Sequence, residues 1–206
     1  MWLKWMLIVA ISMVSLTMLM FVSAFLPFLE QAKTYYHVTK RNDIILLSNS
    51  FNICYLVVSP FLFTILKKHF MLLVNIATLA TGIGCVGRYF ASTDYNWALF
   101  FTILVSVAHV PMITAPYGLL SMFPERHQSY ASSIPLFIPI LGINICIIYG
   151  ILYITEKPIN ALSTYADDIE RLNAIIAVIG LVSCFLTFYC MEKLRPEIEE
   201  ANKPTA

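Results

Sequence analysis

Residues 97–123 read WALFFTILVSVAHVPMITAPYGLLSMF and contain no Asp, Glu, Lys or Arg. At about 1.5 Å per residue, a helix of this length crosses a hydrocarbon core about 30 Å thick. His109 stands near its middle, and Pro111 and Pro116 follow. An ionisable side chain at that depth is costly, and a proline leaves a backbone carbonyl without its helical partner. We therefore expect a central helix, whose polar groups meet neighbouring helices or a cavity.

The whole chain has the composition of a membrane protein. Of its 206 residues, 59% are hydrophobic and 12% are charged, whereas soluble domains carry about 25% charged residues. The charges fall almost wholly between long apolar runs. This pattern predicts an all-α polytopic membrane protein in contact with the lipid bilayer, and it gives no indication of a nucleic-acid partner. The six expected spans are residues 6–28, 44–66, 71–91, 97–123, 131–154 and 172–191.

An even number of spans places both termini on one side of the membrane. Lys and Arg are slightly more numerous on that side, and Lys67 and Lys68 lie in its tightest connection. This bias favours cytoplasmic termini, in the plasma membrane or in an organelle membrane. We expect residues 1–191 to form one transmembrane domain. Residues 192–206 are expected to form a short polar cytoplasmic tail, beginning as a helix that Pro196 interrupts.

Polar and small side chains recur at steps of three and four residues along the spans, which places each set on one helix face. Two interpretations remain open. Small residues let membrane helices approach closely, and hydroxyl and amide groups bond across the interface. Alternatively, the stripes line a shared polar cavity. Under the second interpretation, the substrate pathway comprises His109, Asn52, Tyr55, Tyr117, Asn144 and Tyr149.

The third span and the last connection each allow two interpretations as well. Gly82 and Gly84 favour a close helix crossing. Arg88 lies close to the end of the same span, so its long side chain either extends to the membrane interface or serves in gating or ion contact. The acidic residues of the last connection, residues 155–171, are expected to be solvated. The alternative is an acidic vestibule that concentrates cations.

No catalytic constellation is visible in the sequence, so we expect neither an enzyme nor a metal or cofactor site. His109 has no carboxylate or nucleophile near it within the spans. The five cysteines lie inside apolar runs and form no Cys-x-x-Cys pair, which is typical of buried reduced thiols.

Six spans in this rhythm resemble one half of a major facilitator superfamily transporter, which is built as two inverted three-helix repeats. A short basic loop joins the second and third spans in that superfamily. Lys67 and Lys68 match it, whereas the glycines and the aspartate of that motif are absent. The resemblance implies one half of a transport unit, completed by a second copy of the chain or by another membrane subunit.

A closer resemblance within that superfamily rests on the fragments Ser106-Val107-Ala108-His109-Val110, Ala115-Pro116, Met122-Phe123, Ala131-Ser132 and Leu141-Gly142. On these fragments, residues 4–154 are most similar to the feline leukaemia virus subgroup C receptor-related solute carriers. The resemblance places His109 where that family has a Gln that contacts the substrate. That family also offers a tryptophan in the first span to a quaternary ammonium group, and the middle of residues 6–28 has none.

These observations lead to two hypotheses of function. The first is transmembrane transport of a small organic solute by a half-size transporter, with His109 as a solute contact. An imidazole can donate and accept a hydrogen bond, and its unperturbed pKa of about 6.5 allows proton exchange near neutrality. The second is a non-transporting membrane subunit or scaffold, in which the polar stripes only hold helices together.

Overall fold

The structure, a computed structural model, describes residues 1–159 and 162–201. Within these residues the chain is helical and has no strand. Six of its helical segments are long and apolar enough to cross a membrane. The prediction of an all-α polytopic membrane protein is therefore confirmed. The long helices are α1 (Trp2–Ser23), α3 (Arg41–Lys68), α4 (Phe70–Ala91), α5 (Tyr95–Gly118), α6 (Glu125–Gly150) and α7 (Ala166–Lys193).

Short helices lie at the ends of the long helices, in the connections and in the tail. Pro27 lies in the short helix η1, where the first span breaks and turns into α2. α7 begins several residues before the predicted start of the last span, so its first turn contains acidic residues that were expected in a loop. The short elements are η1 (Leu26–Phe28), α2 (Leu29–Tyr35), η2 (Leu120–Met122), η3 (Ile151–Thr155), η4 (Leu162–Thr164) and α8 (Arg195–Ala201).

The polar tail begins as a helix, as predicted, because α7 runs to Lys193 and the helix is then interrupted at Leu194, two residues before Pro196. Pro196 is the second residue of α8, a position where its missing N–H costs nothing. Pro196 therefore lies in the first turn of a new helix that follows the interruption. Ile198 of α8 is buried, and Lys4 forms an ion pair with Glu197 at 2.6 Å, so α8 packs near the start of α1. Residues 202–206 of the predicted tail lie outside the described residues.

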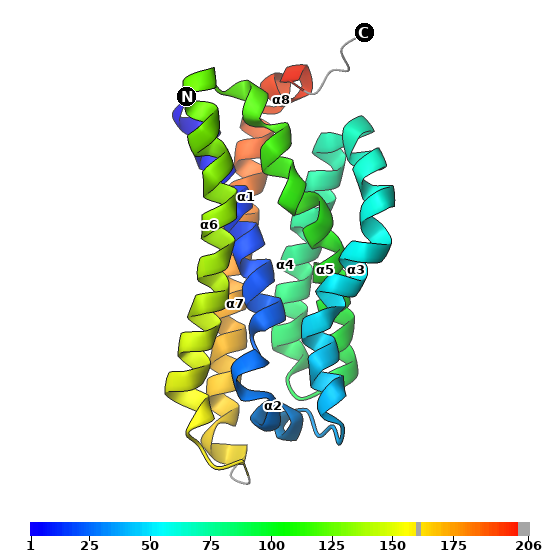
Figure 1. The fold of residues 1–206 in the computed structure, drawn as a ribbon, viewed down its shortest axis with the longest axis vertical. Helices are drawn as coiled ribbons and strands as arrows, with labels where there is room; N and C mark the ends of the chain where they lie inside the picture. Colours follow the sequence, from blue (N-terminus) through cyan, green and yellow to red (C-terminus); the bar gives the residue numbers. More distant parts are fainter. Residues whose placement is uncertain (160–161, 202–206) are drawn as a thin grey trace.

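The long helices stand side by side, with α1 near the centre and both termini at one end of the bundle (Figure 1). α2 lies at the opposite end, and α8 lies at the end that carries the termini. α3 contains Pro60 and bends along its length. The shared end for both termini agrees with an even number of spans.

The packing of the helices has an internal symmetry. α1 packs against α6 and α7, and α5 packs in the same way against α3 and α4. Further contacts join α1 to α5 and α4 to α7. Exchanging the first three long helices with the last three leaves this set of contacts unchanged. Because each set has three alternating helices, the two sets run in opposite directions. The bundle is thus two interlocked and inverted three-helix units.

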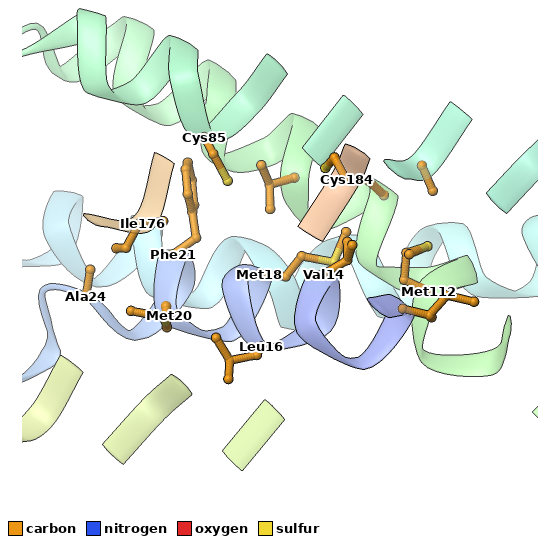
Figure 2. Close-up of a cluster of buried hydrophobic side chains, with 14 of the residues drawn as sticks. Val14, Leu16, Met18, Met20, Phe21, Ala24, Cys85, Met112, Ile176 and Cys184 are labelled. Atoms are coloured by element: carbon orange, nitrogen blue, oxygen red, sulfur yellow. The ribbon is translucent and has the colours of Figure 1, made fainter. Parts of the chain in front are cut away.

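Apolar side chains fill the space around α1. Val14, Met18 and Phe21 of α1 meet Cys85 of α4 and Cys184 of α7 in one cluster of buried side chains (Figure 2). The outer faces are apolar too, because α3 and α6 expose large hydrophobic side chains along much of their length. Such surfaces suit contact with lipid and not with water. The protein is therefore an integral membrane protein that contacts the lipid bilayer.

Two glycines mark close crossings of these helices. A Cβ atom added to Gly84 would lie 2.3 Å from Cγ2 of Val105, and one added to Gly142 would lie 2.6 Å from the backbone oxygen of Leu16. The close crossing predicted for the third span is confirmed at Gly84, where α4 meets α5. Gly82 differs, because its added Cβ would make only an ordinary contact of 3.4 Å with Sγ of Cys184.

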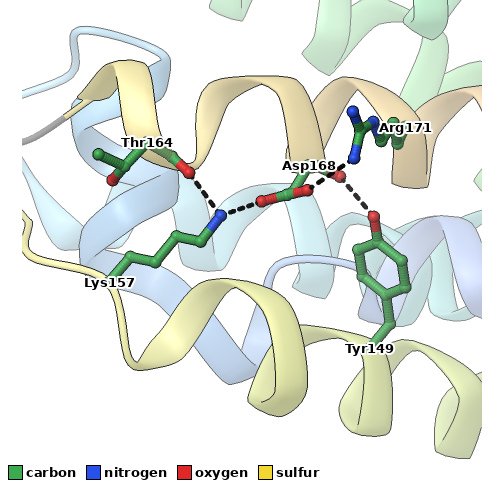
Figure 3. A network of polar contacts seen from close by, with 5 residues as sticks. All are labelled: Tyr149, Lys157, Thr164, Asp168 and Arg171. Atoms are coloured by element: carbon green, nitrogen blue, oxygen red, sulfur yellow. Dashed lines mark hydrogen bonds and ion pairs between the residues drawn. The ribbon is translucent and has the colours of Figure 1, made fainter.

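An ion-pair network ties α6 to α7 at the end opposite the termini (Figure 3). Asp168, in the first turn of α7, is buried and pairs with Lys157. Arg171 reaches the other carboxylate oxygen at 3.5 Å, and the hydroxyl of Tyr149 donates to the backbone oxygen of Asp168 at 3.1 Å. The prediction that the acidic residues of this connection are all solvated is therefore wrong for Asp168. Its carboxylate needs these partners, because a buried charge is costly without them.

Candidate functional site

A cavity of about 270 Å³ opens on the side of the bundle, where Tyr117, Leu136 and Ile140 of its lining are exposed. This volume is close to the lower end of the range for small-molecule sites, about 300 Å³. Its lining comes from α1, α3, α5 and α6, which are the two pairs of helices that the internal symmetry exchanges. The cavity therefore lies where the two inverted units meet. The lining residues are Ser15, Leu19, Phe51, His109, Met112, Ile113, Tyr117, Pro135, Leu136, Pro139 and Ile140.

The cavity lies at the depth of the membrane centre. His109 is at the middle of the span Tyr95–Met122, and Ile140 is at the middle of the span Glu125–Thr155. Both side chains line the cavity from different helices. The site is therefore as far as the bundle allows from water on either side.

Prolines give this apolar cavity hydrogen-bond acceptors from the backbone. Pro116 has no N–H to donate to the carbonyl of Met112, and Pro139 has none for the carbonyl of Pro135. Met112 and Pro135 both line the cavity. Each of their carbonyls lacks its usual partner along the helix, so it is available to a ligand or a water molecule.

His109 is the most polar group at the cavity. Its side chain is 1% exposed, and its ring lies 4.5 Å from the ring of Phe51 between centroids, tilted by 37°. Its Nδ1 atom is buried without a hydrogen-bond partner. The nearby hydroxyl of Ser106 does not supply one, because it donates to the carbonyl of Thr102 and contacts the hydroxyl of Ser50 at 3.2 Å. A buried imidazole nitrogen without a partner is stabilised by a ligand that forms a hydrogen bond with it.

The predicted pathway residues fall into three groups. His109 and Tyr117 line the cavity, and the ring of Tyr55 lies 5.9 Å from Phe51, one residue removed from the lining. Asn52 and Asn144 are exposed on the outer faces of α3 and α6. Tyr149 is not at the cavity, because its hydroxyl takes part in the network around Asp168.

Other lining residues were not predicted as site residues. Ser15 is a single hydroxyl in an apolar run, and Phe51 and Met112 look like ordinary core residues in the sequence. Pro135 and Pro139 are four residues apart, and this helical spacing was the one signal that could have marked them. Among the lining residues none carries a formal charge at pH 7 with His neutral. The site therefore suits a neutral, largely apolar molecule with a polar group that meets His109.

Arg88 lies apart from the cavity, near the opposite end of the bundle from the termini. It is 1% exposed, so it does not extend to the membrane interface, and that interpretation is wrong. Its guanidinium carbon lies 4.2 Å from the ring centre of Phe21 and 4.3 Å from that of Phe25, and its Nη1 donates to the backbone oxygen of Phe21. That oxygen is in the last turn of α1, where carbonyls lack helical partners. A cation at this end also complements the helix dipole.

Comparisons of the sequence with known proteins add no family. No protein-family model matches the chain, and no curated protein matches it either.

Proposed function

We propose that this protein transports a small, neutral organic solute across the membrane, and that the cavity at His109 binds the solute during transport. The observation that carries the proposal is the place of the cavity, at the membrane centre and between two inverted three-helix units. Secondary transporters place their sites at this junction, where one unit rocks against the other. The resemblance to half of a major facilitator transporter also supports transport, with a second half that completes the pathway.

The exposed amides on the outer faces support a partner in the membrane. Asn52 and Asn144 are exposed among apolar side chains of α3 and α6. An amide that faces lipid loses its hydrogen bonds, which costs about 1–3 kcal/mol or more. A second copy of the chain, or another membrane subunit, would cover these groups and complete the pathway.

A non-transporting scaffold is the second candidate function, and one observation favours it. Several hydroxyls within the bundle donate to carbonyls of their own helix, including those of Thr17, Thr78 and Thr102. These groups are satisfied locally and leave nothing for a solute. The unpaired Nδ1 of His109 is the contrasting case, and it is the reason we rank transport first.

Uptake into vesicles tests the proposal. Native mass measurement would first show that the purified protein is assembled. The assembled protein would then be reconstituted into liposomes, and these vesicles would be exposed to a cell extract of small metabolites. Mass spectrometry should find at least one neutral organic compound that enters these vesicles and not empty ones. If no compound enters the vesicles that contain assembled protein, the result contradicts transport and favours the scaffold.

We also propose that both termini are cytoplasmic. Thr93 and Ser163 are exposed in connections at the end opposite the termini, and Glu199 is exposed on α8. In intact cells, a membrane-impermeant maleimide should label cysteines introduced at Thr93 and Ser163 and should not label one at Glu199. Labelling only of the cysteine at Glu199 would show the opposite orientation, with both termini outside the cytoplasm. The unmodified chain serves as the control, since its own cysteines lie within the spans.

A further inference from the structure

Unsatisfied polar atoms gather around Arg88, where no function has yet been assigned. Nε and Nη2 of Arg88 and the hydroxyls of Tyr35 and Tyr36 are all buried without a hydrogen-bond partner. A native protein leaves few such atoms, and each one calls for an explanation such as a bound ion or water. Four of them on three residues indicate that something is bound among them.

These groups lie next to one another at the end of the bundle. The ring of Tyr36 lies 5.0 Å from that of Tyr35 and 5.4 Å from that of Phe25, which stacks on the guanidinium of Arg88. The Tyr36 hydroxyl is close enough to Arg88 and Asn173 to interact with both, although it makes no hydrogen bond of ordinary geometry with either. The cluster thus joins the end of α2 to α4 and α7.

The charge of Arg88 is not balanced within the cluster. An arginine keeps its charge in proteins. Among the described residues no carboxylate pairs with it, and its electrostatic neighbours are Tyr36, Cys85 and Cys146. Burial raises the pKa of the Tyr36 phenol above its ordinary value, so this hydroxyl is a neutral donor at pH 7. The end of α1 supplies only about half a negative charge, and the two rings add a modest attraction.

We propose that Arg88 and the hydroxyl of Tyr36 bind one small monovalent anion such as chloride. Nε and Nη2 of Arg88 and the Tyr36 hydroxyl can all donate, as an anion requires, and a bound water would leave the charge unbalanced. Oδ1 of Asn173, the other buried unpaired atom beside Tyr36, only accepts, so it takes no part in binding the anion. The donor atoms are buried, so the anion must lie inside the protein. The bound anion links α1, α2 and α4, and it therefore stabilises this end of the bundle.

The melting temperature of the purified chain tests this site without any knowledge of a solute. Sodium chloride should raise it in a saturable way, compared with sodium gluconate at the same ionic strength, because gluconate is too large to enter. Purified protein should also bind radioactive chloride directly. Arg88→Gln should abolish both effects. Arg126→Gln, which changes an exposed arginine at the other end of the bundle, should leave both intact.

A second variant keeps the test decisive if Arg88→Gln does not fold. Tyr36→Phe retains the charge and removes one donor, so chloride affinity should fall about fivefold, the value of one ordinary hydrogen bond. Wild-type protein that binds no chloride, and melts alike in chloride and gluconate, would overturn the proposal and leave only water at Arg88. Because transport is not measured, failure here leaves the role of the His109 cavity untouched.

Discussion

Gly142→Ala should destabilise the protein more than a Gly→Ala substitution at any of its other glycines. The new Cβ would lie 2.6 Å from the backbone oxygen of Leu16 and 2.9 Å from Cγ of Met20. A backbone atom cannot rotate away, so α1 and α6 must separate. Overpacking of this kind costs about 3 kcal/mol. For a chain of this length that lowers the melting temperature by about 10 °C, which thermal unfolding in detergent would measure.

Gly82→Ala is the matched control, because it adds the same methyl group to another membrane helix. There the Cβ would be 3.4 Å from its nearest neighbour, Sγ of Cys184. We expect a change within about 1 kcal/mol, with the helix propensity of alanine acting in its favour. Equal melting temperatures for the two variants would show that α1 and α6 do not cross as closely as the structure has them.

The second large effect is expected at His109. His109→Ala should reduce solute uptake per folded molecule by about tenfold or more, because the hydrogen bond of the imidazole to the solute is lost in an apolar cavity. His109→Gln should keep uptake within about threefold of wild type, since an amide also donates and accepts. Uptake of the compound found in the vesicle screen, normalised to folded protein, is the measurement.

The opposing interpretation of His109 predicts a different pair of results. If the imidazole only holds helices together, both variants should lower the melting temperature and leave uptake per folded molecule unchanged. That outcome would remove His109 from the binding site, whatever the solute.

The number of spans could be predicted from the sequence because it depends on one strong signal. Charge-free runs of about 20 residues have no other stable place than a bilayer. The ends of the helices were harder to predict. Pro27 breaks the first span in a region that is still apolar, and α7 starts among the acidic residues from Ala166 onward because Asp168 finds partners in Lys157 and Arg171.

The candidate site was only partly predictable, for a related reason. Helical spacing shows that Ser48 and Asn52 share a face of one helix, but it does not show which neighbour that face meets. Ser48 is buried and Asn52 is exposed, because α3 bends and packs mainly against α5. His109 was predicted correctly as a buried polar residue, because an ionisable side chain at mid-span is too costly to face lipid.

Arg88 shows the limit of a rule based on position. Near a span end, a long basic side chain ordinarily reaches the interface. Here the broken end of α1 presents the unpaired carbonyl of Phe21 and two aromatic rings, and these hold the guanidinium inside the bundle. That combination joins residues 21–25 to Arg88, two segments far apart in the sequence, so no local pattern could have indicated it.

Filling the cavity tests the central claim most directly. Ile113 lines the cavity from α5, whereas Ile103 of the same helix is exposed to lipid. Ile113→Trp should block the cavity and abolish uptake while the protein stays folded, and Ile103→Trp should transport as wild type does. If folded Ile113→Trp takes up the solute at the wild-type rate, the cavity at His109 is not the transport pathway.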